Sequence, residues 1–421
     1  MAKVAIFTIG CKVNQAESYE LKAGLVESGH TIVCDAASAD LCVVNTCTVT
    51  AESDRKCRKL LRALAKRGAS SIVAAGCYAE VNSQDLEGMP DVVRIIPNAR
   101  KDNWLAEVLS LLPEGQGGDA EPIPGRERAF IKVQDGCERG CSYCIVPRAR
   151  GPERSRRPAE VLQCVSKHLA EGVEEIVLCG VNLGRYDRGA GKDLAYLVRE
   201  VLEAGEGFRI RMSSIELEDL RMDWVKDWSR QPRLCPHLHL PLQSGDTDIL
   251  RAMGRGYGAQ DFLDVVERVR GAWPRAALTT EVIVGYPGES DAAFRNTVEV
   301  LTLMRPARVH VFRFSARPGT AAWNSGAEIV PGSMEERSGI LRGLAEEWRL
   351  EYIEERRGEL RDMLVEKVVR TGGKKAALGT TEDYIKGTAY GLHPDVKPGN
   401  TVRVEIRGLE GGRALLEATA P

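Results

Sequence analysis

Three cysteines in the middle of this chain carry its strongest local signal for chemistry. They form a CxxxCxxC motif, Cys137-Glu-Arg-Gly-Cys141-Ser-Tyr-Cys144. Soft thiolates this close together favour an iron–sulfur cluster or zinc. Three thiolates leave the fourth iron of a cubane without a protein ligand, so that this iron can bind substrate. Zinc would usually need a fourth Cys or His ligand nearby. The two candidates, Cys164 and His168, fit poorly because both fall on a predicted helix. The motif therefore favours a cluster over zinc or structural thiols.

Three more cysteines each follow a short, β-branched apolar run. Cys11, Cys47 and Cys77 come directly after residues 4–10, 41–46 and 71–76, and helix-like sequence follows at 15–28, 53–67 and 83–87. Alternating strands and helices predict a doubly wound α/β sheet. The loops after parallel strands gather at one edge of such a sheet, where ligands bind. This shared position predicts a second three-thiolate site, against the alternative of three buried small hydrophobic residues.

The remainder of the chain predicts two further structural parts. A Gly- and Pro-rich segment at 115–125 has the composition of a linker. Beyond it, about six strand–helix units and a charged helix at 334–357 indicate a partial (β/α)6 TIM-type barrel with its site at the carboxyl ends of the strands. The strands are expected at 129–134, 175–179, 208–213, 238–243, 278–284 and 309–314. From about residue 358, short strands bounded by turn residues predict a small β-barrel.

Charge and cysteine content limit the function classes. The 58 basic and 60 acidic residues give a net charge of −2, so a polyanion would have to bind a local patch. No apolar run is long enough to span a membrane, and the N-terminus has no signal-peptide pattern, which predicts a cytoplasmic protein. Twelve cysteines in that compartment favour ligands or packing over disulfides. The other six cysteines are interpreted as structural: Cys34, Cys42, Cys57, Cys164, Cys179 and Cys235.

The chain resembles the radical S-adenosylmethionine (SAM) methylthiotransferases. The resemblance rests on the CxxxCxxC motif and on Gly10-Cys11-Lys12-Val13-Asn14, Asn45-Thr46-Cys47-Thr48-Val49-Thr50 and Gly76-Cys77. It continues through Cys144-Ile-Val-Pro147, Gln243-Ser244-Gly245 and Val284-Gly285-Tyr-Pro287-Gly288-Glu289, so it covers the whole chain in order. The first two motifs are most similar to the MtaB branch, which acts on tRNA N6-threonylcarbamoyladenosine next to the anticodon. Glu281 and Phe314 depart from the family pattern, where Asp and Tyr are usual.

The resemblance implies three domains and two clusters. The domains would be 1–114, a methylthiotransferase N-terminal domain, 126–357, a radical SAM core, and 358–421, a TRAM-like β-barrel. Cys137, Cys141 and Cys144 would hold the [4Fe-4S] cluster that binds SAM, whereas Cys11, Cys47 and Cys77 would hold an auxiliary [4Fe-4S] cluster. The reaction would convert the adenine C2–H bond to C2–SCH3 in tRNA position 37, with a reducing protein as electron donor. The alternatives are another tRNA adenosine or a ribosomal protein as substrate, a non-enzymatic iron–sulfur redox protein, and a zinc-stabilised RNA-binding protein.

Several side chains are predicted to contact ligands, each against a plain structural role. Tyr143, Asn182, Glu216 and Gln243 are candidate SAM contacts; the last three follow or end barrel strands, where cofactor-binding groups belong. Tyr143 is as readily a core tyrosine, and the other three are as readily loop caps. A basic run supplies candidate contacts to substrate phosphate or to the threonylcarbamoyl carboxylate. These residues are Arg148, Arg150, Arg154 and Arg156. The two triads are further expected to face each other across a shared cavity.

Overall fold

The computed structural model describes residues 1–69, 71–115, 127–187, 191–324 and 331–419, which divide into two compact units. Unit 1 comprises Met1–Pro124, Gln134–Ser155 and Ser315–Ser325. Unit 2 comprises Gly125–Val133, Arg156–Phe314 and Gly326–Pro421. Most of the linker predicted at 115–125 lies outside the described residues. The chain therefore passes between the units more than once, and both predicted cysteine triads belong to unit 1.

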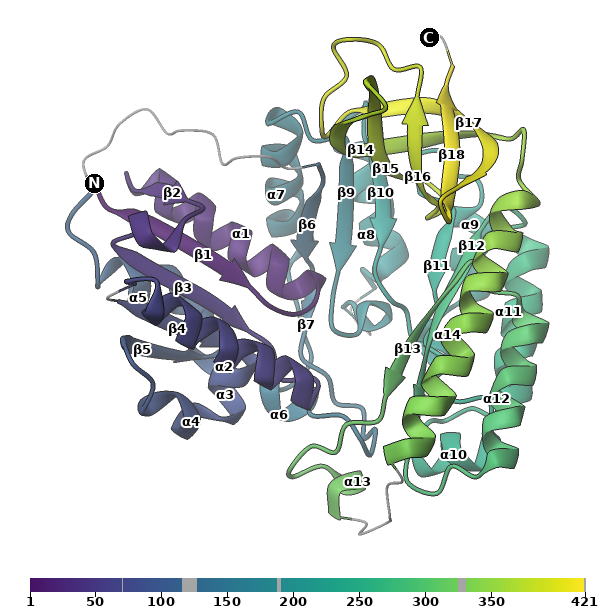
Figure 1. Ribbon diagram of the computed structural model, residues 1–421, viewed down its shortest axis with the longest axis horizontal. Helices are drawn as coiled ribbons and strands as arrows, with labels where there is room; N and C mark the ends of the chain where they lie inside the picture. The colour runs from purple at the N-terminus through teal and green to yellow at the C-terminus, as the bar shows by residue number, and fades with distance from the viewer. Residues whose placement is uncertain (70, 116–126, 188–190, 325–330, 420–421) are drawn as a thin grey trace. The chain divides into compact units, whose positions relative to one another are not determined.

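Unit 1 is built on a five-stranded parallel sheet in the order β2-β1-β3-β4-β5 (Figure 1). Alternate strand residues point to opposite faces, so Val4, Val43 and Val73 pack with α1 and α5, whereas Ala5, Val44 and Ala74 pack with α2, α3 and α4. The predicted doubly wound sheet is confirmed. Its elements are β1 (Lys3–Thr8), α1 (Lys12–Glu27), β2 (Thr31–Val33), η1 (Ala36–Ser38), β3 (Leu41–Thr46), α2 (Ala51–Lys66), β4 (Ile72–Gly76), α3 (Cys77–Val81), α4 (Ser83–Glu87), β5 (Val92–Pro97), η2 (Asn98–Asn103) and α5 (Trp104–Leu109).

Two later segments complete unit 1. The first, Gln134–Ser155, carries the CxxxCxxC motif between two short paired strands, β7 (Gln134–Asp135) and β8 (Arg154–Ser155), with α6 (Val146–Arg150) after the last cysteine. The second, Ser315–Ser325, contains α13 (Ala321–Asn324). Residues far apart in the sequence therefore meet in unit 1.

Unit 2 contains six parallel strands in two sheets, β10-β9-β6 and β11-β12-β13, each in sequential order. The backbone of Ile210 in β10 bonds to Arg233 and Cys235, which joins the two sheets. The predicted partial barrel is confirmed. Its elements are β6 (Ala129–Lys132), α7 (Pro158–Ala170), β9 (Glu175–Cys179), η3 (Leu183–Arg185), α8 (Leu194–Glu203), β10 (Arg209–Met212), η4 (Leu217–Asp219), α9 (Met222–Trp228), β11 (His237–His239), α10 (Thr247–Ala252), α11 (Ala259–Ala272), β12 (Ala277–Val284), α12 (Asp291–Met304), β13 (Arg308–Arg313) and α14 (Pro331–Glu354).

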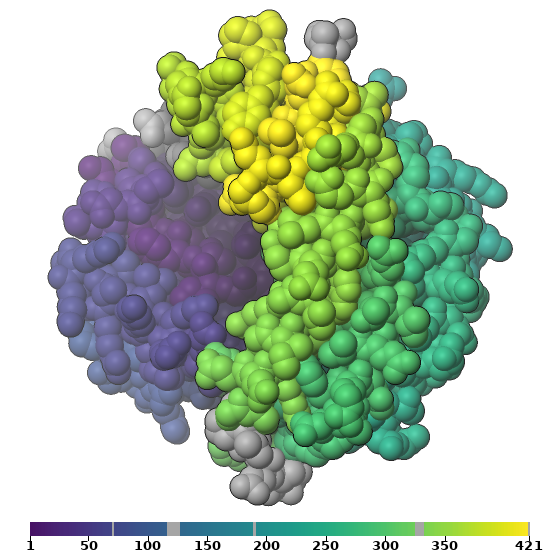
Figure 2. All heavy atoms as spheres, turned by 45° about the vertical axis from the view of Figure 1, so that its right-hand side comes forward, coloured from purple at the N-terminus to yellow at the C-terminus, as the bar shows by residue number. Residues whose placement is uncertain are grey.

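The C-terminal part of unit 2 is a closed five-stranded barrel in the order β14-β15-β16-β18-β17, as expected of a TRAM-like fold. Pairing of β17 with β14 closes it. Figure 2 shows this barrel in yellow and yellow-green, with α14 running on from it in green. The sequence predicts three of its strands, at 362–370, 384–392 and 400–409, and does not predict β15 and β18. The strands are β14 (Leu360–Thr371), β15 (Lys374–Thr381), β16 (Lys386–Tyr390), β17 (Thr401–Glu410) and β18 (Arg413–Ala418).

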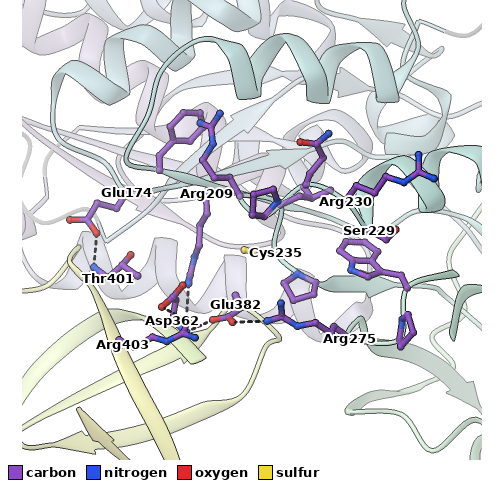
Figure 3. Close-up of a pocket in the computed structure, with 18 of the residues that line it drawn as sticks. Glu174, Arg209, Ser229, Arg230, Cys235, Arg275, Asp362, Glu382, Thr401 and Arg403 are labelled. Atoms are coloured by element: carbon purple, nitrogen blue, oxygen red, sulfur yellow. Dashed lines mark hydrogen bonds and ion pairs between the residues drawn. The ribbon is translucent and has the colours of Figure 1, made fainter. Parts of the chain in front are cut away.

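A buried charge cluster joins the small barrel to the amino ends of the β9 and β10 strands. Glu175, the first residue of β9, pairs with Arg209 at 2.7 Å and with Arg211 at 3.1 Å. The same two guanidinium groups donate to backbone carbonyls of Asp362, Thr380, Thr381 and Glu382 in the small barrel. Arg209 also borders a cavity of about 740 Å³ that lies between the two parts (Figure 3). At this contact the small barrel is therefore joined to the strands by ion pairs and hydrogen bonds rather than by apolar packing.

No helix in the described ranges is long and apolar enough to cross a membrane.

Candidate active site

The first cysteine triad lies along one edge of the unit 1 sheet. Cys11 follows β1 and is the N-cap of α1, Cys47 follows β3, and Cys77 follows β4 as the first residue of α3. Because β1, β3 and β4 are adjacent parallel strands, the three residues share the carboxyl edge of the sheet, where the strand–loop pattern predicts a ligand site. Cys47 and Cys77 are buried and Cys11 is exposed.

The three thiols are close enough to influence one another. Burial, and to a lesser extent the charges of Cys77 and Cys11, raise the pKa of Cys47 to about 11. Although the residue Cys11 is exposed, the protein atoms around its thiol remove enough water to raise the pKa of that thiol, which the charge of Arg150 opposes. A β-carbon on Gly10, whose φ is +124°, would lie 3.0 Å from Cβ of Cys47, so only glycine permits this approach of the two loops. A metal that binds a thiol such as Cys47 displaces its proton and converts it to a thiolate ligand.

Asparagines hold the three cysteine loops in place. The Asn14 amide donates to the carbonyls of Ile9 and Thr46, at 2.9 and 3.0 Å, so it joins the loops of Cys11 and Cys47. The Asn45 amide donates back to the Asn14 carbonyl at 2.9 Å. The Asn98 amide donates to Sγ of Cys77 at 3.3 Å. Asn14 and Asn45 fall within the motifs quoted above, but the hydrogen bonds that give them this role join residues more than 30 positions apart in the sequence.

Cys57 supports the Cys47 loop from α2. The Cys47 amide donates to Sγ of Cys57 at 3.4 Å, and the Cys57 thiol is placed to donate to the Cys47 carbonyl at 3.3 Å. Burial raises the pKa of Cys57 to about 12, which keeps its proton available for this bond. The side chain of Thr50, the N-cap of α2, accepts from the Ser53 amide and starts that helix. This arrangement fits the structural role predicted for Cys57.

The second triad is carried by a tight loop in the same unit. The Cys137 amide donates to the Gly151 carbonyl at 3.1 Å, and the Cys144 amide donates to the Cys141 carbonyl at 3.1 Å. Gly136, with φ of +73°, precedes the first cysteine, and a β-carbon there would lie 1.9 Å from the Pro152 carbonyl oxygen. These contacts hold the two ends of the loop close together, which a compact three-thiolate site requires.

The two cysteine-bearing regions meet through α6. This helix, which follows Cys144, packs against α3, which begins at Cys77. The Asn98 amide that contacts Cys77 Sγ also donates to the Ala149 carbonyl in α6 at 2.5 Å. Whether the two triads face a shared cavity stays a prediction, but their supporting elements are in direct contact within unit 1.

Arg150, at the end of α6, enters a buried group of charges. Its guanidinium donates to Glu17 at 3.0 Å, to Asp135 at 2.8 Å and to Asn14 Oδ1 at 2.5 Å. Lys101 donates to the other oxygen of Glu17 at 2.5 Å. The basic run predicts Arg150 as a substrate contact, and no sequence pattern singles out Lys101, Glu17 or Asp135. The Arg150 guanidinium bonds to these protein partners, and its contact with substrate stays a prediction.

The segment Ser315–Ser325 binds both cysteine loops. Arg317 donates to Thr48 Oγ1 at 2.7 Å and to Asp54 Oδ2 at 2.6 Å, beside Cys47. On the other side, the Ala322 amide donates to the carbonyl of Ser142, between Cys141 and Cys144. No sequence pattern points to a role for this segment, because its partners are more than 170 residues away.

Replacing Arg317 by Gln is expected to lower the iron content of the purified protein. Arg317 is 4% exposed and is the counter-ion of Asp54, whose carboxylate is largely buried. Removal of one partner of a buried ion pair is strongly destabilising, because the other charge remains without compensation. Iron per chain and the cluster absorbance measure the effect. Arg313→Gln is the matched control, because Arg313 is half exposed and its pair with Glu335 is 3.5 Å long. Equal iron in the two variants would contradict the structural role of Arg317.

Three of the predicted SAM contacts follow the carboxyl ends of unit 2 strands. Asn182, Glu216 and Gln243 follow β9, β10 and β11, respectively. Asn182 is buried, and Glu216 pairs with Arg255. Tyr143, the fourth, is partly buried in unit 1. Their contact with SAM stays a prediction.

Gln243 shows the clearest sign of a ligand contact. Its φ is +70°, a strained value for a residue other than glycine, and its amide group donates to Glu281 Oε1 at 2.9 Å. Its Oε1 atom is buried without a hydrogen-bond partner among the described residues. Burial alone would raise the pKa of Glu281, but hydrogen bonds and charge from His239 and Gln243 lower it. An acceptor left open beside an ionised carboxylate fits a ligand that carries a positive charge, as SAM does.

The other predicted arginines differ in exposure. Arg148 is exposed and donates to the Pro318 carbonyl at 2.7 Å. Arg154 is half exposed, 3.5 Å from Asp135 and 3.8 Å from Asp102. Arg156 is partly buried in unit 2, with Nη1 4.0 Å from Cys164 Sγ. Contact with substrate stays a prediction for these three.

The donor chemistry of both triads fits iron–sulfur clusters. None of the twelve cysteines, all of which the structure describes, forms a disulfide. In the described ranges, no three His, Cys, Asp or Glu side chains are already arranged around one metal position. Cys11, Cys47 and Cys77 would hold one cluster and Cys137, Cys141 and Cys144 the other; once bound, the clusters supply electron transfer and an open iron.

The comparisons with known proteins agree with this reading of the residues. Residues 131–301 match the radical SAM superfamily, and residues 3–97 match the uncharacterized protein family UPF0004. Among solved structures, the radical SAM methyltransferase TsrM from Kitasatospora setae covers 79% of this chain and 80% of its own, with a TM-score of 0.56 at 13% identity, a likeness of fold. The fold and the CxxxCxxC loop define a radical SAM enzyme, whose class uses SAM and a [4Fe-4S] cluster.

Relatives define the family within that class. The threonylcarbamoyladenosine tRNA methylthiotransferase MtaB of Thermotoga maritima is 35% identical over 98% of this chain and 96% of its own. The MtaB of Chlamydia pneumoniae is 36% identical over 86% of each chain. The tRNA-2-methylthio-N(6)-dimethylallyladenosine synthase of Parafrankia sp. is 36% identical over 81% of this chain and 73% of its own. The chain belongs to the radical SAM tRNA methylthiotransferases, a family that carries two clusters.

Proposed function

We propose that this enzyme converts N6-threonylcarbamoyladenosine at position 37 of tRNA, beside the anticodon, to its 2-methylthio derivative. The similarity to the MtaB enzymes over nearly the whole chain carries the choice of substrate. The placement of six cysteines in one compact unit supports the chemistry. One SAM molecule supplies the methyl group and another, cleaved with one electron, activates the unreactive C2–H bond of adenine.

The chain's own residues would position and shield these groups. Asn182, Glu216 and Gln243, at the carboxyl ends of three strands, would bind SAM, with Tyr143 on its adenine. Arg148, Arg154 and Arg156 would contact substrate phosphate or the threonylcarbamoyl carboxylate, for which a guanidinium fork is well suited. A reducing protein would supply electrons in the cytoplasm. We also propose the division into domains 1–114, 126–357 and 358–421.

Mass spectrometry of tRNA nucleosides tests the proposal. A host that lacks its own enzyme for this step is expected to gain 2-methylthio-N6-threonylcarbamoyladenosine when this chain is expressed. The variant Cys144→Ala serves as the inactive control. A product derived from dimethylallyladenosine, or a thiolated ribosomal protein, would identify the alternative substrates and contradict the proposal.

A further inference from the structure

The four buried charges around Arg150 sum to zero while the thiols are neutral, and the half-exposed Arg154 lies 3.5 Å from Asp135 at their edge. Arg150 and Lys101 carry two positive charges, and Glu17 and Asp135 carry two negative ones; all four side chains are more than nine-tenths buried. When three thiolates bind a [4Fe-4S]2+ cluster, the site gains one net negative charge, and one-electron reduction adds another. Cations nearby would stabilise this charge in a site with little water.

The two cations lie on the side of Cys11 and Cys77. Nη2 of Arg150 donates to Asn14 Oδ1, the same atom that lies 3.6 Å from Sγ of Cys11. Burial opposes the charge on Arg150, but the charges of Cys77, Glu17, Asp135 and Cys11 outweigh it and raise the pKa of its guanidinium. Burial and the charge of Arg150 lower the pKa of Lys101, whereas the charges of Glu17 and Cys77 act in the opposite direction. Its ammonium is 5.1 Å from the ring centroid of Trp104 and 3.1 Å from Asn45 Oδ1, which fixes its position.

We propose that Arg150, assisted by Lys101, is the positioning residue that sets the reduction potential of the auxiliary cluster held by Cys11, Cys47 and Cys77. Arg150 is supplied by α6, directly after the CxxxCxxC loop, so one segment carries the three ligands of one cluster and the counter-charge of the other. The assignment rests on the proposed function only for the identity of the cluster.

The opposite charge beside Arg150 gives the inference a sign test. Replacing Arg150 by Gln removes a positive charge and is expected to shift the midpoint potential of the auxiliary cluster to more negative values. Replacing Glu17 by Gln removes a negative charge from the same network and is expected to shift the potential to more positive values. Arg150→Lys keeps the charge and is expected to remain near the unsubstituted value. If the ion pair were purely structural, both Gln variants would lose cluster occupancy, and their midpoint potentials would not shift in opposite directions.

The experiment is a redox titration followed by electron paramagnetic resonance of the full-length chain. A background with Cys137, Cys141 and Cys144 replaced by Ala isolates the auxiliary cluster. Arg157→Gln is the matched control, because Arg157 is exposed and pairs with its sequence neighbour Glu160. Opposite shifts for Arg150→Gln and Glu17→Gln support the inference. Potentials that do not move, or that move in the same direction, would overturn it while leaving the proposed function standing. Loss of all cluster from the background itself would overturn the cluster assignment.

Discussion

Replacing Cys11, Cys47 and Cys77 together by alanine is expected to halve the iron content of the anaerobically purified enzyme, from about eight to about four atoms per chain. The second triad remains intact, so SAM should still be cleaved to 5′-deoxyadenosine, while the methylthiolated tRNA product is lost. Replacing Cys137, Cys141 and Cys144 should also halve the iron but abolish 5′-deoxyadenosine formation. Iron analysis and chromatography of the small products separate the two cases.

The chain offers a control for these thiol replacements. Cys34 is exposed and follows β2, whose last residue, Val33, pairs with Ala5 and so ends short of the carboxyl end of β1. Cys34→Ala should therefore keep full iron and full activity. An unchanged iron content in either triple variant would show that the cysteines concerned are not ligands, and the two-cluster assignment would fail.

Replacing Glu175 by Gln is expected to destabilise unit 2 by about 3–5 kcal/mol at neutral pH, because it leaves buried arginines without their counter-ion. Arg211 is 1% exposed and Arg209 is 8% exposed, so water cannot take the place of the carboxylate. Urea unfolding followed by circular dichroism measures the loss. The variant Glu203→Gln, at an exposed site at the end of α8, is the control.

The effect should depend on pH in a defined direction. Burial would raise the pKa of Glu175, but Arg211, Arg209 and Arg128 outweigh it and hold this pKa far below its usual range. A depressed carboxyl pKa contributes stability that is complete above the unfolded-state value of about 4.3 and is lost as pH falls further. The difference in free energy of unfolding between the original chain and Glu175→Gln should therefore decrease as the pH is lowered from about 5 to about 3. An increase of this difference in free energy of unfolding on acidification would contradict stabilisation by the Glu175 ion pairs.

The sequence alone predicted the elements whose signals are local. Cysteine spacing, strand-ending cysteines and alternating apolar runs identified the doubly wound sheet, the partial barrel and the two triads as candidates, because each of these patterns is read from neighbouring residues of one continuous segment. Short or edge strands such as β2 and β5 have weak patterns, and they were missed. So were β15 and β18, although Gly372-Gly373 and Gly411-Gly412 mark their turns.

Only the tertiary structure decided which charges meet. Arg150 looks like one of several exposed arginines in its basic run, yet its partner Glu17 is 133 residues away and both are buried. The same holds for Arg317 with Asp54 and for Arg209 with the small barrel. A local pattern records the period of a helix or strand, whereas the energy of a buried charge depends on whichever segments the fold brings around it.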